Sequence, residues 1–470
     1  MSVVPATPTT ADRAADVIRG KDLPAWEVFG QRLVHHEIHL NGRRIELLRG
    51  PIELEGFSVR VFDPRDGAMG VGFASSNDPS PEGVRRAFDS ARRTAPHSTF
   101  PARSVELPGS NGAASSLQTV DPTIRDAPAA SIQEFVRHLL DQFPQRSDVQ
   151  PSFGSVRVTY GERSVANSSG LHRSGVSSYV EFEWAVKASG GPEGRPPGEY
   201  WVNSDARRLD GGDLGIQVER WAELARDVRI AKAPPSGSLD VVFPPEALHD
   251  IIPPILGFRL SGSARLRKMA PEVGSPIAAP LVSISDEPHA PWGVGSMEFD
   301  DEGLSTRARP VIQGGSVSSI FYDLLHAASF GEPPTGSGHR SIGYLSTWFR
   351  FPSSVMPGPS NLTVAAGKDG SDEELIGSVR DGLWLQQLGY AFPDPVSGAY
   401  GGEIRIGYRI RNGKLAEPVR GGTIGGLLMG PQGAGSLLRD VRAVGTVSRQ
   451  VGHLTTPPLL VGATPVAGPD

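Results

Sequence analysis

The stretch ALHDIIPPIL, residues 247–256, contains residue types of a zinc-peptidase helix but not their spacing. Such helices place two histidines about one turn apart, so that both imidazoles reach one cation and the intervening acid acts as general base. Here Asp250 follows His249, but Pro253 and Pro254 stand four and five residues after the histidine. Proline offers no ligand and disrupts an interior helical turn. We therefore expect His249 to be an ordinary helix residue near a domain face.

A second candidate is HHEIH, residues 35–39. On a strand, His35, Glu37 and His39 would share one face, a spacing that could hold a metal ion. The dipeptide Asn41-Gly42 lies one residue further on and predicts a tight hairpin turn. We therefore favour a solvated hairpin face over a metal site.

Acidic residues cluster in two places, Asp286 with Glu287 in ISDEP and residues 300–302 in MEFDDEG. Such carboxylates could bind a hard cation or act as acid and base. An Asp/Glu/Gly cluster after a strand is more often a turn whose side chains accept backbone N–H groups, and we favour that interpretation.

Three glycine-rich loops, PTGSGHR, SGAYGGE and RGGTIGG, lack phosphate-loop spacing and predict tight turns. No G-x-S-x-G elbow is present, so local sequence assembles no Ser/His/Asp triad.

The elements that must position these residues form two domains, because 470 residues exceed what one hydrophobic core usually organises. We expect an N-terminal tail over 1–22, an α/β domain over 23–231, a linker over 232–238 (KAPPSGS) and a β-rich domain over 239–470. The class is therefore α+β. Patterns predict strands at 155–166 and 176–188, and helices at 84–91, 132–143 and 214–228. Ser131 and Glu134 form a capping-box pattern before the second helix.

Composition narrows the function classes. The formal net charge is -6 and no run of like charges appears, so nucleic acid and anionic membranes are not expected partners. The sequence contains no cysteine, which excludes disulfides and thiolate zinc ligands. It contains neither an apolar leader nor an uninterrupted apolar span of membrane length. We expect a cytoplasmic protein.

Longer stretches resemble the TldD/PmbA family, formerly called modulators of DNA gyrase. The resemblance runs from about Val34 to Val461, and its most specific part is 284–340, from ISDEPHAPWG to PPTGSGHR. It also includes FSVRVFDPRDGAMGVGFAS, VANSSGL, VVFPPEAL and IRNGKLAEPVRGGTIGG. It implies a two-domain TldD/PmbA-like fold, with an α/β N-terminal domain and a β-rich C-terminal domain, that dimerises around an internal cleft.

Members of the TldD branch carry H-E-x-x-x-H and a distant cysteine as zinc ligands. In this sequence Pro254 takes the second histidine position, and cysteine is absent. The chain therefore resembles the TldE/PmbA branch, which implies a pseudoenzyme without independent catalysis. Such a subunit binds unfolded peptide by strand addition beside a TldD-type partner that supplies the zinc, with no cofactor on this chain. The partner could also be a second copy.

Two alternatives stay open. One is a repurposed family member that acts without zinc in small-molecule or peptide natural-product biosynthesis, using acid/base chemistry. The other is a homodimeric binding or scaffold protein without turnover. We assign no catalytic residue and no metal ligand. The cleft candidates are His249, Asp250, Asp286, Asp301, Glu302 and His339, and the candidate substrate-binding turn contains Thr335 and Gly336.

Overall fold

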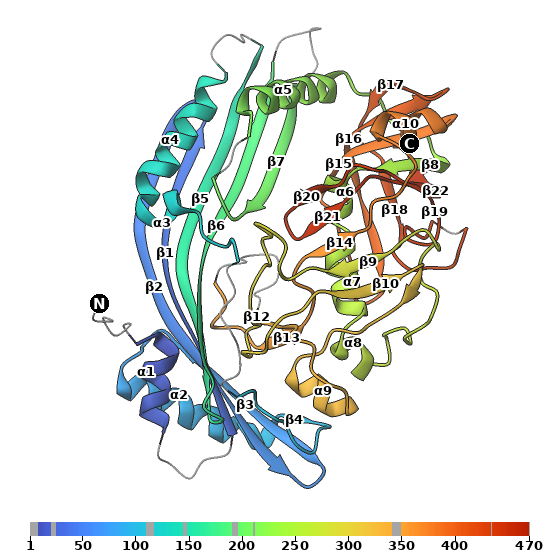
Figure 1. Ribbon diagram of the computed structural model, residues 1–470. Helices are drawn as coiled ribbons and strands as arrows, with labels where there is room; N and C mark the ends of the chain where they lie inside the picture. Colours follow the sequence, from blue (N-terminus) through green and yellow to red (C-terminus); the bar gives the residue numbers. More distant parts are fainter. Residues whose placement is uncertain are drawn as a thin grey trace.

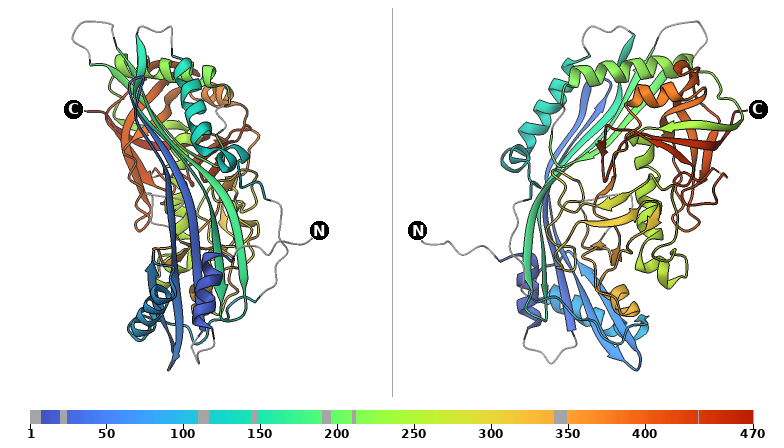
Figure 2. Two further views of the ribbon diagram at one scale, coloured as in Figure 1. Left: turned by 90° about the vertical axis from the view of Figure 1, so that its left-hand side faces the viewer. Right: turned by 45° about the vertical axis from the view of Figure 1, so that its right-hand side comes forward.

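The computed structural model describes residues 8–19, 25–109, 117–143, 148–189, 196–209, 212–340, 349–433 and 435–469. Helices and strands are mixed throughout, so the expected α+β class is confirmed. Figure 1 shows the N-terminal half as one long curved sheet with helices, and the C-terminal half as a more compact β-rich body on one side of it. Figure 2 shows the same arrangement from two further directions.

The N-terminal sheet has seven strands in the order β4-β3-β2-β1-β5-β6-β7, and every neighbouring pair is antiparallel. The expected hairpin at Asn41-Gly42 is confirmed, because Asn41 pairs with Arg44 and Gly42 has a φ of 57°. Both predicted strands lie inside longer ones. The strands are β1 (Ala25–Asn41), β2 (Arg44–Arg65), β3 (Ala68–Ser76), β4 (Thr99–Phe100), β5 (Val149–Asn167), β6 (His172–Ala188) and β7 (Gly198–Ala206).

Helices pack on this sheet through the apolar stripes that the sequence indicated. Within the segment expected to be a tail, residues 10–18 form a helix whose alanines pack in a core with β1 and β2. The helices predicted at 84–91 and 214–228 are both present. The helices are α1 (Thr10–Ile18), α2 (Pro81–Thr94), the short η1 (Ala95–His97), α3 (Pro122–Asp126), α4 (Pro128–Asp141) and α5 (Leu214–Ile230).

The capping box expected at Ser131 and Glu134 was wrong. Helix α4 begins at Pro128, four residues before the expected start at 132, and the hydroxyl of Ser131 donates to the carbonyl oxygens of Thr123 and Ala127. Proline at the first helical position has no N–H to satisfy and its φ already suits a helix, so Pro128 determines the start.

The C-terminal half contains two larger sheets around the largest apolar core of the described residues. One has the order β11-β10-β9-β14-β21-β20; the other has β15-β8-β22-β18-β16-β17, with β19 on β22. The strands of the first sheet are β9 (Ile284–Asp286), β10 (Arg309–Gln313), β11 (Ser316–Val317), β14 (Leu362–Val364), β20 (Arg449–Val451) and β21 (Leu454–Thr456). Those of the second are β8 (Gly237–Phe243), β15 (Asp381–Gly389), β16 (Ala399–Arg411), β17 (Lys414–Val419), β18 (Thr423–Leu427), β19 (Val441–Val444) and β22 (Leu459–Ala467).

The remaining elements are short. A two-stranded ribbon joins β12 (Gly338–Arg340) to β13 (Val355–Pro357). The helices are α6 (Pro245–His249), α7 (Ile252–Arg259), α8 (Gly262–Leu266), α9 (Leu324–Phe330) and α10 (Asp372–Ser378). In the described ranges, none of the helices has the length and apolarity required to cross a membrane.

Candidate functional site

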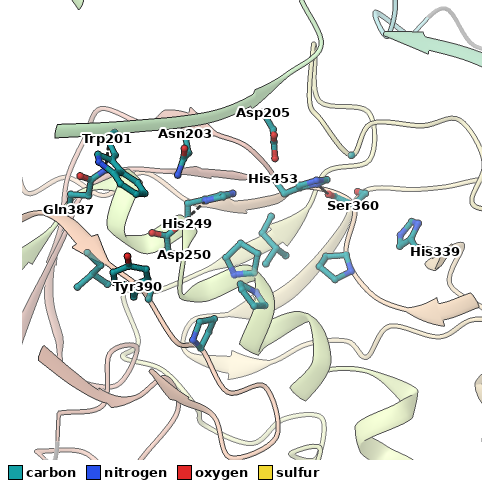
Figure 3. Close-up of a pocket in the computed structure, with 18 of the residues that line it drawn as sticks. Trp201, Asn203, Asp205, His249, Asp250, His339, Ser360, Gln387, Tyr390 and His453 are labelled. Carbon is teal, nitrogen blue, oxygen red and sulfur yellow. Dashed lines mark hydrogen bonds and ion pairs between the residues drawn. The ribbon is translucent and has the colours of Figure 1, made fainter. Parts of the chain in front are cut away.

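A cavity of about 770 Å³ lies between strand β7 of the N-terminal sheet and the C-terminal half (Figure 3). This volume lies within the usual range for ligand-binding pockets. Its walls come from segments far apart in the sequence, so only the packing of the two halves creates it. They include residues 201, 203 and 205 from β7, 249, 250, 253 and 254 from α6, α7 and the turn between them, 295 and 297, 339 and 340, 359, 360 and 362, 387–391 and 393 from the end of β15 and the loop after it, Arg405 from β16, and His453.

The β7 wall is formed by Trp201, Asn203 and Asp205. Alternate residues of a strand point to the same face, so these three side chains project together towards the C-terminal half (Figure 3). Burial raises the pKa of Asp205, and the nearby His249 partly offsets that effect. None of these three residues was predicted as a site residue. No strand was predicted for this segment from the sequence, and three residues at alternate positions do not by themselves indicate a binding site.

The two prolines after His249 account for the start of a new helix shortly after this residue. Helix α6 ends at His249, and α7 begins at Ile252 with Pro253 and Pro254 in its first turn. First-turn N–H groups have no partner within a helix, so proline is tolerated there. His249 and Asp250 both reach the cavity, with Nδ1 of the histidine 3.4 Å from a carboxylate oxygen of the aspartate. The expectation of an interrupted helix is confirmed.

His453 is a cavity residue that sequence reasoning missed. It occupies the turn between β20 and β21, and its Nδ1 lies 2.9 Å from the carbonyl oxygen of Ser360. A carbonyl only accepts, so Nδ1 carries the proton, which leaves Nε2 as the acceptor of the neutral ring. Burial lowers the pKa of His453 to about 4, and the neighbouring His249 adds to that effect. No local motif contains His453, so only the fold could reveal it.

Of the remaining candidates, His339 lines the cavity. Asp286 does not line it but binds Ser360, which does. Asp286 is buried and accepts hydrogen bonds from the Ser360 N–H at 2.8 Å, the Ser360 hydroxyl at 2.6 Å and the Asn361 N–H at 3.1 Å. Burial raises the pKa of Asp286 to about 6 and lowers the pKa of His339 to about 4. Asp286 therefore positions Ser360, which does line the cavity.

The cluster at residues 300–302 is buried and fully engaged in structural contacts. Asp300 accepts from the N–H groups of Glu302, Leu304 and Gly338, as the turn interpretation predicted. Asp301 pairs with Arg163 and Arg350 at 3.2 Å each, and Glu302 pairs with Arg60 at 2.6 Å. These carboxylates join the two halves of the molecule, and none of them lines the cavity.

The turn at Thr335 and Gly336 also lies outside the cavity wall. The Thr335 hydroxyl accepts from the N–H of Tyr322 at 2.7 Å and donates to its carbonyl at 2.9 Å. Gly336 has a φ of 64° and lies close to the Ser305 carbonyl, so glycine is required there. Thr335 instead borders a separate hollow of about 370 Å³.

The expected solvated face at HHEIH was wrong. Strand β1 lies between β2 and β5, and His35 and Glu37 are buried. Glu37 is 3.2 Å from Nε2 of His39 and 3.5 Å from Arg157, and it also pairs with Arg49. Arg49 of β2 and Arg157 of β5 therefore reach over β1 and balance the charge of Glu37.

Ser263, His326 and Asp323 adopt the hydrogen-bond order of a catalytic triad. The serine hydroxyl lies 3.1 Å from Nε2 of His326, and Nδ1 of His326 lies 2.7 Å from Asp323. However, Ser263 is only 5% exposed, and neither cavity includes it. Asp323 also caps α9 by accepting from the His326 N–H. We interpret the three as a structural tie between α8 and α9.

The residues at the motif position do not fit the donor set of a zinc peptidase. His249 is followed by Asp250, Pro254 carries no ligand atom, and the sequence contains no thiol. Across the described ranges, no group of three or more His, Cys, Asp or Glu residues is placed to hold a metal ion. We therefore assign no step of any reaction to a metal on this chain.

Comparisons with known proteins agree with this architecture. Residues 236–468 match the model of the PmbA/TldA metallopeptidase C-terminal domain, and residues 26–95 match PmbA/TldA metallopeptidase domain 1. The metalloprotease TldD homolog of Haemophilus influenzae is 28% identical over 41% of this chain, and the chain spans only 39% of that relative. Metalloprotease PmbA of Escherichia coli O157:H7 is 24% identical over 77% of this chain and 78% of its own length.

A solved structure shows the same fold along nearly the whole chain. The crystal structure of TldE from Thermococcus kodakarensis covers 97% of this chain and 98% of its own, with a TM-score of 0.79 and 19% identity. The two domain models, the sequence relatives and the fold all point to one family. The chain belongs to the PmbA/TldD metallopeptidase family.

Proposed function

We propose that this chain is a zinc-free, TldE/PmbA-like subunit of a cytoplasmic TldD/TldE-type metalloprotease complex. Its cavity binds unfolded peptide, and a TldD-type partner supplies the zinc. The proposal rests on one observation, the position of His249 in the cavity wall without further zinc ligands beside it among the described residues. This position corresponds to the first histidine of the family motif, it reaches a cavity of ligand-binding size, and it lacks companion zinc ligands.

The shape of the cavity supports a peptide as the ligand. Trp201, Asn203 and Asp205 follow one another at every second residue of β7. An extended peptide has the same two-residue repeat, about 6.6 Å, so its alternate side chains would meet these three residues in turn. The structural relative named TldE supports the assignment to that branch, and a relative named as a zinc metalloprotease TldD homolog, from Saccharolobus solfataricus, supports a partner type that carries zinc.

The test is cleavage of a fluorescently labelled, unstructured peptide by this chain alone, by a TldD-type homologue alone and by their mixture. Light scattering after size exclusion gives the complex mass, and zinc is quantified on each separated subunit. We expect a mixed complex, with cleavage and zinc only where the partner is present. A partner variant with its first motif histidine changed to alanine is the matched control, and it should assemble without cleaving.

Cleavage by this chain alone, with stoichiometric zinc, would contradict the proposal. Turnover by this chain alone without zinc would instead favour a repurposed family member. One observation favours that second candidate: His453 lies close to His249, and His249 lies close to Asp205, so the cavity wall holds three groups that could act as acid or base. Genes for small-molecule or peptide tailoring next to this one would agree with it.

A further inference from the structure

The two ends of the cavity differ in the side chains that they present. Figure 3 shows the aromatic rings of Trp201 and Tyr390 at one end, with Gln387, His249 and Asp250 beside them, and Asp205, His453 and His339 towards the other. The aromatic end also includes residues 388, 391 and 393, all of which line the wall. A ligand that spans the cavity therefore meets two different chemical environments.

Trp201 is held in place at the aromatic end. The side-chain amide of Gln387 donates to the Trp201 carbonyl at 2.6 Å, and the indole N–H donates to Glu199 at 2.9 Å. The guanidinium of Arg405 lies 4.3 Å from the ring centroid. A ring fixed before binding loses little side-chain entropy when a ligand packs on it, so Trp201 is suited to act as a binding platform.

Tyr390 forms the opposite lip and is unusual in two ways. The residue is 67% exposed although it lines the cavity, and its φ is 53°, in the left-handed region that residues with a side chain rarely adopt. Phe392, two residues later, is 72% exposed. Backbone strain concentrates at ligand-binding segments, and exposed apolar clusters mark contact sites. The loop after β15 thus presents the Tyr390 ring at the cavity wall and a second exposed ring, Phe392, close by in sequence.

We infer that Trp201 and Tyr390 form a subsite for an apolar side chain of an extended peptide, so that the substrate class is unfolded segments rich in large apolar residues. This inference rests on the proposed function and adds selectivity to it. Such segments are buried in folded proteins and become exposed on unfolding. An aromatic pair would therefore distinguish unfolded from folded chains.

Fluorescence anisotropy with two labelled, unstructured peptides tests the subsite. The peptides have equal length and charge, and one has Phe and Leu at alternate positions where the other has Ser and Gln. The test variant is Tyr390→Asn, because asparagine tolerates a left-handed backbone and removes the ring. The control is Val396→Ser, an exposed apolar residue of the same loop that does not line the cavity.

We expect the wild-type chain to prefer the apolar peptide by about tenfold, and Tyr390→Asn to abolish that preference while leaving affinity for the polar peptide unchanged. Val396→Ser should behave as wild type. Equal wild-type affinity for both peptides, or equal losses on both in Tyr390→Asn, overturns the subsite and leaves the proposed function standing. Failure of the wild-type chain to bind either peptide, alone or in the mixed complex, counts against the proposed function itself.

Discussion

Gly452 allows the turn between β20 and β21 to approach His249. Its φ is 50°, and a Cβ atom at this position would overlap Nε2 of His249. The geometry of the cavity wall at His249 therefore depends on the absence of a side chain at Gly452, a residue from which four helices separate it in sequence.

We predict that Gly452→Ala displaces His249 and weakens peptide binding by about tenfold, because the new methyl group forces the imidazole out of its place. The matched control is Gly421→Ala, which has a similar φ of 71° but nothing within 4 Å of the added carbon. Both variants should lose about 1–2 kcal/mol of unfolding free energy from the left-handed alanine. Equal peptide affinity in the two variants would contradict the contact.

The burial of His339 should make the free energy of unfolding depend on pH. Burial lowers its folded-state pKa to about 4 from an ordinary value of 6.5, while Asp301 opposes the shift and Arg350 and Arg163 reinforce it. Below pH 6.5 the unfolded chain binds a proton that the folded chain does not, so this contribution to stability is lost as pH falls from 6.5 to 4.

We expect His339→Gln to lose less unfolding free energy than wild type between pH 7 and pH 4.5, by on the order of 1–2 kcal/mol. Urea denaturation at the two pH values measures the difference. Asp286 shifts in the opposite direction, but it is present in both proteins and cancels in the comparison. An identical pH slope in the two proteins would show that His339 titrates normally.

Among the elements, α8 and α9 are joined by Ser263, His326 and Asp323. The tie is reinforced by the Phe100 ring, which meets the His326 imidazole edge-on at 5.5 Å between centroids. Phe100 belongs to β4 of the N-terminal sheet, so this small polar network lies where the two halves meet.

If this network is structural, Ser263→Ala should cost about 1 kcal/mol of unfolding free energy and leave peptide cleavage by the mixed complex unchanged. A fluorophosphonate probe, which labels activated serines, should not modify the wild-type chain. Labelling of Ser263, or loss of cleavage in a stable Ser263→Ala variant, would instead establish a second catalytic site.

Across the whole molecule, buried ion pairs join the halves. Glu27 of β1 is fully buried and accepts from Arg60 of β2 and from Arg340 of β12 at 2.7 Å each. Arg60 also reaches Glu302 at 2.6 Å. The cluster therefore connects the N-terminal sheet to the C-terminal segment that forms part of the cavity wall.

Glu27→Gln should destabilise the protein by about 3–5 kcal/mol, because it leaves a buried guanidinium without its counter-charge. The control is Arg86→Gln, which removes an exposed pair with Asp78 and should cost less than about 1 kcal/mol. Denaturant unfolding of both variants measures the contrast. A loss below 1 kcal/mol in Glu27→Gln would mean that water or relaxation solvates Arg340.

Much of this organisation could be predicted from the sequence. Period-two and period-3.6 patterns located β5, β6, α2 and α5, because local hydrophobic spacing reflects which face of an element is buried. Asn41-Gly42 located the hairpin, and the two prolines after His249 indicated an interrupted helix. The sequence alone also shows that Pro254 stands where the motif has its second histidine and that no cysteine is present, since both facts depend on residue identity alone.

Only the tertiary structure decided which residues share the cavity. Trp201, Tyr390 and His453 come from different sheets and carry no local motif, whereas Asp301 and Glu302 resembled site residues and proved to be buried ion-pair partners. The physical reason is that burial and charge pairing depend on contacts between segments hundreds of residues apart. The sequence by itself determined where the helices and strands form and which residues stand at the zinc-motif positions. The packing of the two halves determined which side chains line the cavity and therefore its chemistry.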